Sequence, residues 1–265
     1  MGSSSPRLWQ YSQANSPLPL PTTPMMFSNR ELVTLIAPGM PDSETLDLDG
    51  LRTWVSNHKT QNGDSLGDMI DLSDKRPLLL AGELANPYRL ADIMAPDLPL
   101  IPIRLEGLCR TWADSLDSRE VQPGIHHVTI ASSPGWWEAS HLTMIGVQQM
   151  KDLVGWLDGV NRGSWRPVRA GEGVIRLEND SEIGYPSVEE MSWDGIEERV
   201  EIEIPAANGP ALDLSTVIIP VHTKYGCYDS RGKIIRCAHM PQRTFHDNAF
   251  RRGSSKKWDA ILKTL

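Results

Sequence analysis

The chain has 265 residues, of which 40% are hydrophobic and 23% are charged, and its formal net charge at pH 7 is −8. This length allows one large or two small globular domains with a sizeable core, and three cysteines are too few for a disulfide scaffold. No apolar run approaches the roughly 18 residues of a membrane span, and the N-terminus lacks the apolar core of a signal peptide, so the transmembrane and secreted classes are not expected.

Residues 1–26 are rich in Pro and Ser and poor in aliphatic side chains. Such a segment cannot bury enough apolar surface to offset its ordering entropy. We therefore interpret residues 1–26 as an arm that is flexible or held by a partner.

Residues 27–160 are predicted to form an α/β region. Ser28 and Glu31 have the spacing of a capping box, which predicts a helix from residue 28 that ends at Pro38. A second helix is predicted where Leu51, Trp54, Val55 and His58 share one face.

Short apolar runs then alternate with helical patterns. Runs at 78–81, 100–105 and 125–131 are typical of buried strands, and helices are predicted after them. The first helix would begin at Asn86, the second would carry Leu108, Trp112 and Leu116, and the third would run from Ser140 to 158 with Gly159 as its cap. Strands alternating with helices favour a short parallel-type sheet.

Residues 165–240 have a different texture, with β-branched runs separated by Gly, Pro, Asn and Asp. This pattern predicts an antiparallel β region, with a hairpin turn at 229–232. The fold class expected for the whole chain is therefore α+β, with an α/β-type N-terminal half and an antiparallel C-terminal half.

Residues 241–265 form a basic C-terminal arm. Six Lys and Arg follow Met240 against two Asp, so these residues carry +4 and residues 1–240 carry −12. An amphipathic helix is predicted after Ser254 or Ser255. The candidate binding residues are Arg251, Arg252, Lys256, Lys257, Trp258, Ile261, Leu262 and Leu265.

The carboxyl ends of the predicted parallel strands indicate a candidate crevice for an enzyme or a small-molecule or nucleotide-binding protein. It would combine Glu83, Glu106 and the loop 132–141. The candidate catalytic residues of this crevice are Glu83, Glu106, Ser132, Ser133 and His141. No phosphate-binding or dinucleotide motif is present, and no cofactor is expected.

Cys227, Cys237 and His239 supply the ligand types of zinc. The predicted hairpin would bring the two cysteines close together. Two buried thiols without a metal are the competing interpretation, because no Cys-x-x-Cys pair is present.

The leading interpretation is a structural protein that self-associates through its terminal arms, such as a viral coat, matrix or virion component. Its expected partner is a further copy of the chain. Nucleic acid or an anionic membrane surface is the alternative partner of the basic C-terminal arm. The expected location is intracellular, in the cytoplasm or in a virion.

Overall fold

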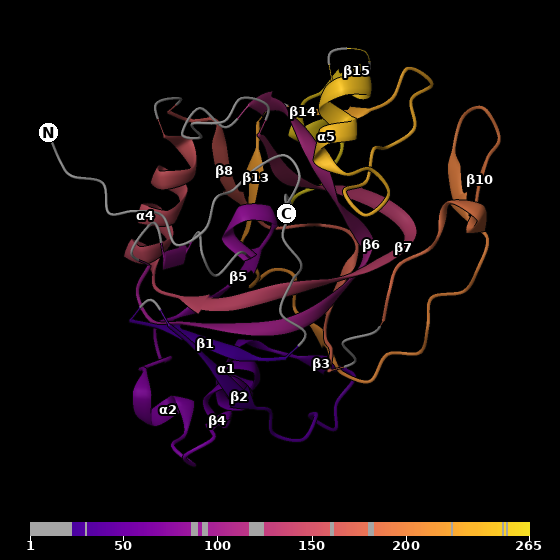
Figure 1. Cartoon of the computed structure of the whole chain (residues 1–265). Coiled ribbons are helices and arrows are strands. Elements are labelled where there is room, and N and C mark those ends of the chain that lie inside the picture. The colour runs from indigo at the N-terminus through magenta and orange to yellow at the C-terminus, as the bar shows by residue number, and fades with distance from the viewer. Residues whose placement is uncertain are drawn as a thin grey trace, which may run out of the picture.

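The structure is a computed structural model that describes residues 23–265 apart from 30, 86–89, 92–94, 117–124, 160–161, 180–182, 224, 251 and 253. The side chains at 83, 225–227 and 254–255 are also outside the description. The chain has an α+β fold, which confirms the predicted class at that level. One mixed sheet contains most of the strands, and helices pack around it (Figure 1).

A long hairpin organises the fold. Its strands β6 (Leu98–Leu116) and β7 (His126–Ile145) pair antiparallel over most of their length. The other edge of β6 pairs with β1 (Met25–Ser28) and β9 (Val174–Leu177), and the other edge of β7 pairs with β5 (Arg76–Leu80). All of these pairings are antiparallel, so the predicted parallel sheet over 27–160 is wrong.

The main sheet has the order β3-β12-β9-β6-β1-β2-β4, and β7 and β5 extend it from β6. Its further strands are β2 (Glu31–Ile36), β3 (Thr45–Leu46), β4 (Lys59–Thr60) and β12 (Ala211–Leu212). The β3–β12 pair is parallel. Since β9 and β12 lie in the same sheet as β5, β6 and β7, the two predicted halves share one sheet.

Three smaller antiparallel pairs lie outside the main sheet. They are β8 (Trp165–Val168) with β13 (Ile219–His222), β10 (Met191–Trp193) with β11 (Glu198–Val200), and β14 (Tyr225–Tyr228) with β15 (Ser254–Lys256). The turn at 229–232 is confirmed, because the Asp229 carboxylate accepts the N–H groups of Arg231 and Lys233 at 2.8 and 3.0 Å.

The predicted helix through Leu51 is confirmed as α1 (Leu48–Ser56). Asp47 caps it by accepting the Gly50 N–H at 2.8 Å, and Leu51, Trp54 and Val55 are buried. The other helical segments whose ends lie within the described residues are short, apart from α4. They are α2 (Leu66–Met69), α4 (Val147–Asp158), α5 (Gln242–Thr244) and the single turns η1 (Gly82–Ala85), η2 (Val188–Glu190), η3 (Phe245–Ala249) and η4 (Trp258–Ala260).

The sheet is covered on two faces by different core clusters. Leu78 and Leu80 of β5 belong to the cluster that contains Leu153 and Leu157 of α4, whereas Leu79 between them belongs to the cluster that contains α1. Side chains alternate along a strand, so α1 and α4 cover opposite faces of β5. Leu79 and the residues on either side of it are therefore all apolar, which explains the continuous apolar run at 78–81.

Three predicted helices differ from the structure. Residues 25–36 form the β1–β2 hairpin, in which Asn29 has a φ of 50° that suits a tight turn. Leu108, Trp112 and Leu116 lie on β6, and Ser140 lies on β7, so that α4 begins at Val147 rather than at Ser140. The predicted end of α4 at Gly159 is correct; its φ is 53°. The helix predicted from Asn86 begins outside the described residues.

Candidate functional site

The candidate site is centred on Arg236, an arginine whose charged side chain lies inside the protein. Its exposed fraction is 4%, and its neighbours Ile235 and Cys237 belong to a buried apolar cluster. The segment that contains Arg236, residues 235–237, runs beside β6. There the Thr111 hydroxyl donates to the Ile235 carbonyl at 2.7 Å, and the Cys237 N–H donates to the Arg110 carbonyl at 2.9 Å. These contacts hold the backbone on both sides of Arg236 and so position its guanidinium.

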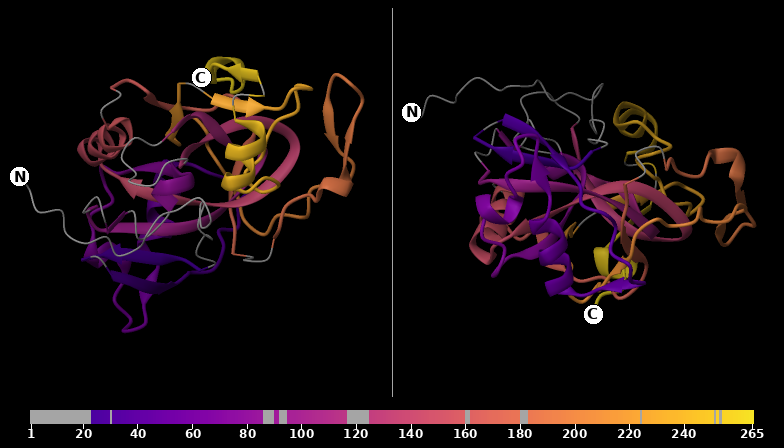
Figure 2. Two further views of the ribbon diagram at one scale, coloured as in Figure 1. Left: turned by 45° about the horizontal axis from the view of Figure 1, so that its top comes forward. Right: turned by 90° about the horizontal axis from the view of Figure 1, so that it is seen from below.

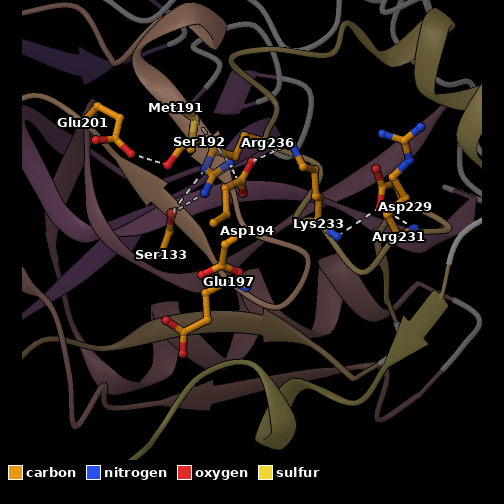
Figure 3. Close-up of polar contacts among 11 residues, drawn as sticks. Ser133, Met191, Ser192, Asp194, Glu197, Glu201, Asp229, Arg231, Lys233 and Arg236 are labelled. Atoms are coloured by element: carbon orange, nitrogen blue, oxygen red, sulfur yellow. Dashed lines mark hydrogen bonds and ion pairs between the residues drawn. The ribbon is translucent and has the colours of Figure 1, made fainter.

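The Arg236 guanidinium has partners on two different segments (Figure 3). Nη1 donates to Glu198 Oε2 at 2.8 Å, while Nε and Nη2 donate to Ser133 Oγ at 3.2 and 2.8 Å. The guanidinium carbon also lies 4.6 Å from the ring centroid of Trp136, a cation–π contact. The Glu198 side chain is only 13% exposed. The Arg236 and Glu198 charges therefore stabilise each other inside the protein, because an unpaired buried charge is costly.

Ser133 and Trp136 reach the arginine because β7 contains a wide bulge. The register with β6 skips at this point, so that the four residues 133–136 oppose the single residue Gly107. Gly107 has a φ of 70°, a left-handed conformation that favours glycine. Bulges re-aim side chains. The predicted loop 132–141 is therefore part of β7, and its bulge directs Ser133 and Trp136 toward Arg236.

Glu198 belongs to a segment that we call the acidic hairpin, residues 185–204. It contains η2, β10 and β11, and among the described residues β10 and β11 pair only with each other. The segment projects from the body in every view (Figure 1, Figure 2). A two-stranded sheet is marginally stable in water on its own. The contact between Glu198 and Arg236 is therefore an anchor that attaches the hairpin to the body.

One face of the acidic hairpin lies against the body. On β10, Met191 and Trp193 are partly buried, whereas Ser192 between them is exposed. Lys233 Nζ lies 5.5 Å from a Trp193 ring centroid and 4.0 Å from Glu198 Oε1. The opposite face of the acidic hairpin and its turn are exposed to solvent.

The turn of the acidic hairpin is internally ordered. The Asp194 carboxylate accepts the N–H groups of Glu197 and Ile196 at 2.8 and 2.9 Å, and these hydrogen bonds, that of Glu197 first, lower the pKa of Asp194. Gly195 takes the left-handed conformation that the turn requires, with a φ of 100°. Ile196 is nevertheless 84% exposed. The turn thus presents an apolar side chain in a fixed position between two carboxylates.

The outer surface of the acidic hairpin combines apolar and acidic side chains. The exposed fraction is 62% for Val188, 39% for Ile202 and 38% for Ile204. Residues 185–204 also contain seven Asp and Glu against one Arg. Single exposed apolar residues are common, but a group of them on one projecting segment is typical of an interaction surface.

Cys109, Cys237 and Ser133 lie near Arg236 and could in principle act as nucleophiles, but none of them is activated. Burial raises the pKa of the Cys109 thiol to about 12, even though the Arg236 charge opposes the shift, and burial raises the pKa of Cys237 well above its usual value. Both thiols are therefore protonated at neutral pH, and the thiolate is the reactive form. Ser133 Oγ accepts from a guanidinium, which cannot act as a base. The geometry suits an anchor better than a catalytic site.

The structure gives Glu106 a structural role. Its Oε1 lies 2.6 Å from Arg104 Nη2 and its Oε2 lies 3.2 Å from Arg176 Nε. Arg104 is 1% exposed and also lies 3.8 Å from Glu178. Glu106 therefore belongs to a buried ladder of charges across β6 and β9 and is already neutralised by arginines.

The other residues of the predicted crevice are spread along β7. Ser132 donates its backbone N–H to the Ile261 carbonyl at 2.8 Å, and Ser133 binds Arg236. His141 is buried further along the strand, in register with Leu80 of β5 on one side and Pro102 of β6 on the other. The side chain of Glu83 lies outside the description. Because the strands are antiparallel, their carboxyl ends do not meet as the crevice required.

Cys237 and His239 do not form the predicted zinc site with any described group. Cys237 packs against Trp112 and Phe245 in a buried cluster, and His239 Nε2 donates to the Pro186 carbonyl at 2.7 Å. No group of three or more His, Cys, Asp or Glu that could hold a metal ion is found among the described residues. The side chain of Cys227 lies outside the description.

The C-terminal segment is partly built into the body. Ile261 and Leu262 are buried in core clusters, and residues 254–260 form β15 and η4 instead of the predicted amphipathic helix. Leu265 is 73% exposed, and Trp258 is partly buried. Of the four predicted basic contact residues, Arg252, Lys256 and Lys257 are exposed, whereas Arg251 is outside the description. Ile261 and Leu262 are therefore not available to a partner.

Sequence reasoning missed Arg236 and Glu198. A signal for Arg236 was present, because it is a lone charge within the apolar run Ile234–Ile235 and Cys237. Such a charge must be paired if the run is buried. Nothing in the sequence identified Glu198 as the partner, since it is 38 residues away in an acidic stretch.

None of the helices in the described ranges is long and apolar enough to cross a membrane. Comparisons with protein-family models, with curated proteins and with solved structures give no match to this chain.

Proposed function

We propose that this protein is a structural component that assembles from copies of itself, of the kind found in a viral coat, matrix or virion. The observation that carries the proposal is the acidic hairpin, which exposes Val188 in η2 and Ile196 in its turn, and whose two strands have no further strand partners among the described residues. The buried Arg236–Glu198 pair holds this hairpin in place. A surface that is already ordered loses less conformational entropy when it docks.

The terminal segments support the same proposal. Residues 1–26 are a Pro/Ser-rich arm by composition, and residues 241–265 carry an excess of basic residues. Arms of this kind contribute contacts between copies in an assembly. A location in the cytoplasm or in a virion is part of the proposal.

Binding of nucleic acid or an anionic membrane by residues 241–265 stays a separate prediction, supported by the exposure of Arg252, Lys256 and Lys257. Such binding should weaken steeply as salt rises, because phosphate contacts release counterions. Assembly through apolar side chains should depend on salt much less.

The alternative of an enzyme or a small-molecule or nucleotide-binding protein has less support. Glu106 and Ser133 are both bound to arginines, and His141 lies elsewhere on β7. No described arrangement places them around one ligand.

Light scattering coupled to size-exclusion chromatography tests the proposal. At high protein concentration, we expect the full chain to elute with a mass above that of one chain. Ile196→Ser/Ile202→Ser should shift the mass toward a single chain, because it removes two exposed apolar contacts, each worth roughly 1.5–3 kcal/mol when fully buried.

Ile36→Ser is the matched control, because Ile36 is also an exposed isoleucine, at 57%, but lies on β2. A full chain that stays monomeric at high concentration, and that is unchanged when residues 1–24 are removed, would contradict the proposal.

A further inference from the structure

A cleft of about 440 Å³ lies on the side of the molecule that carries α4. It is formed where α4, β8, the segment before β13 and the C-terminal residues meet. Six of its eight described lining residues are apolar, and Arg169 is the charged residue among the eight. The principal lining residues are Met150, Val168, Arg169, Ile218, Trp258 and Leu265.

The cleft is open and its walls are firmly placed. Ile218 is 8% exposed and belongs to the same core cluster as the buried side of α4. The C-terminal residues are fixed by backbone hydrogen bonds, because the Leu265 N–H donates to the Arg169 carbonyl at 3.0 Å and the Gly171 N–H donates to the Lys263 carbonyl at 2.8 Å. The side chains of Arg169 and Leu265 remain exposed.

From these observations we infer that the turn of the acidic hairpin of one copy docks into this cleft of a second copy, with Ile196 as the apolar residue that enters it. This inference rests on the proposed function and names the two surfaces that would carry it. The cleft has ample room for a branched aliphatic side chain, and apolar residues are the majority of those that line it.

The charges of the hairpin turn and of the cleft are also complementary. Asp194 and Glu197 flank Ile196, and their side chains are 49% and 67% exposed. Arg169 lies at the cleft, where it would meet one of these carboxylates. The apolar side chain would supply most of the affinity, whereas the exposed charges would select the orientation, because exposed ion pairs contribute little energy.

The α4 wall of the cleft and the acidic hairpin are far apart within one molecule. In Figure 1 and in the left view of Figure 2, α4 and the acidic hairpin lie on opposite sides of the body. A contact between two different surfaces is head-to-tail, so each added copy leaves one free hairpin and one free cleft. Association should therefore continue to chains or rings instead of stopping at a symmetric dimer.

Complementation between two defective variants tests the inference. Ile196→Asp disables the hairpin and leaves the cleft intact, while Arg169→Glu/Leu265→Asp disables the cleft and leaves the hairpin intact. All three residues are exposed, so both variants should fold. Each variant alone should self-associate about 10- to 100-fold more weakly than wild type, whereas Ile36→Asp should not.

An equimolar mixture of the two variants should form a heterodimer and nothing larger, because one functional hairpin and one functional cleft remain in the pair. If wild type assembles but the mixture forms no heterodimer, or if the cleft variant assembles like wild type, the inferred contact is wrong and the proposed function stands. If Ile196→Asp assembles like wild type, the hairpin is not the contact surface, and the observation that carries the proposed function is lost with the inference. If wild type itself stays monomeric at all concentrations, the proposed function fails as well.

Discussion

Arg236→Met should release the acidic hairpin from the body. The substitution removes the closer counter-charge of the Glu198 carboxylate, which is 13% exposed, and leaves it only Lys233 Nζ at 4.0 Å. It also leaves Ser133 without two donors. Removing one partner of a buried ion pair costs about 3–5 kcal/mol. A protease that cleaves after glutamate should therefore cut within residues 185–204 at least about 100-fold faster in the variant, if cleavage follows the population of the open hairpin.

Arg199→Met is the matched control, because Arg199 lies on the same hairpin but its ion pairs with Asp194 and Glu197 are exposed. Exposed pairs contribute less than about 1 kcal/mol. Arg236→Met/Glu198→Met should be cut more slowly than Arg236→Met, since no buried charge is left unpaired. Equal cleavage rates for Arg236→Met and Arg199→Met would show that Arg236 is not the anchor.

Acid should destabilise the protein through His126. This side chain is fully buried at the start of β7, where its Nδ1 donates to the Ala113 carbonyl at 3.3 Å. Its Nε2 must then accept from His246 Nδ1, 2.9 Å away, because the neutral ring has one donor and one acceptor. The rings of Phe245 and Phe250 pack around it. Protonation would remove the acceptor and place a charge in an apolar cluster.

Burial, with the adjacent His246 second, lowers the pKa of His126 from 6.5 to about 4. A group with a lowered folded pKa takes up its proton more readily in the unfolded chain. Its neutral form therefore stabilises the fold fully above pH 6.5, and this contribution is lost as the pH falls from 6.5 to about 4. The loss amounts to on the order of 3 kcal/mol.

Urea unfolding at pH 7 and pH 4 measures this effect. The free energy of unfolding should fall less between the two pH values in His126→Phe than in wild type, because phenylalanine keeps the ring and cannot take up a proton. Burial also lowers the pKa of His58, so His58→Phe should remove a further part of the pH dependence. An equal decline in wild type and in His126→Phe would contradict the role given to His126.

The elements that could be predicted from sequence are those with a local cause. Asp47 caps α1, Gly159 ends α4, and Asp229 orders the turn at 229–232 through contacts between residues a few positions apart. These signals do not depend on how the chain folds elsewhere. The end of α4 at Gly159 and the turn at 229–232 were predicted correctly. The Asp47 cap was not predicted, and the start of α4 was misplaced because it depends on where β7 ends.

The long hairpin was misread because its strands are buried on both faces. Leu108, Trp112 and Leu116 are spaced by four, which puts them on one face of a helix but also, since four is even, on one face of a strand. Only pairing with β7 decides between the two. The capping-box pattern at Ser28 and Glu31 is ambiguous in the same way, because those residues also face each other across the β1–β2 turn.

The candidate site could be predicted only in part for a related reason. Ser133 was selected from a loop-like sequence that proved to be the bulge of β7, but its partner Arg236 comes from more than 100 residues further along the chain. Nothing local in the sequence of residues 185–204 showed that the acidic hairpin would project from the body.

Sedimentation velocity of the unmodified chain over a wide concentration range tests self-assembly most directly. We expect the weight-average sedimentation coefficient to rise continuously with concentration, without a plateau at the dimer, because head-to-tail contacts leave free surfaces at both ends. A single species with the mass of one chain at every concentration would contradict self-assembly through the acidic hairpin.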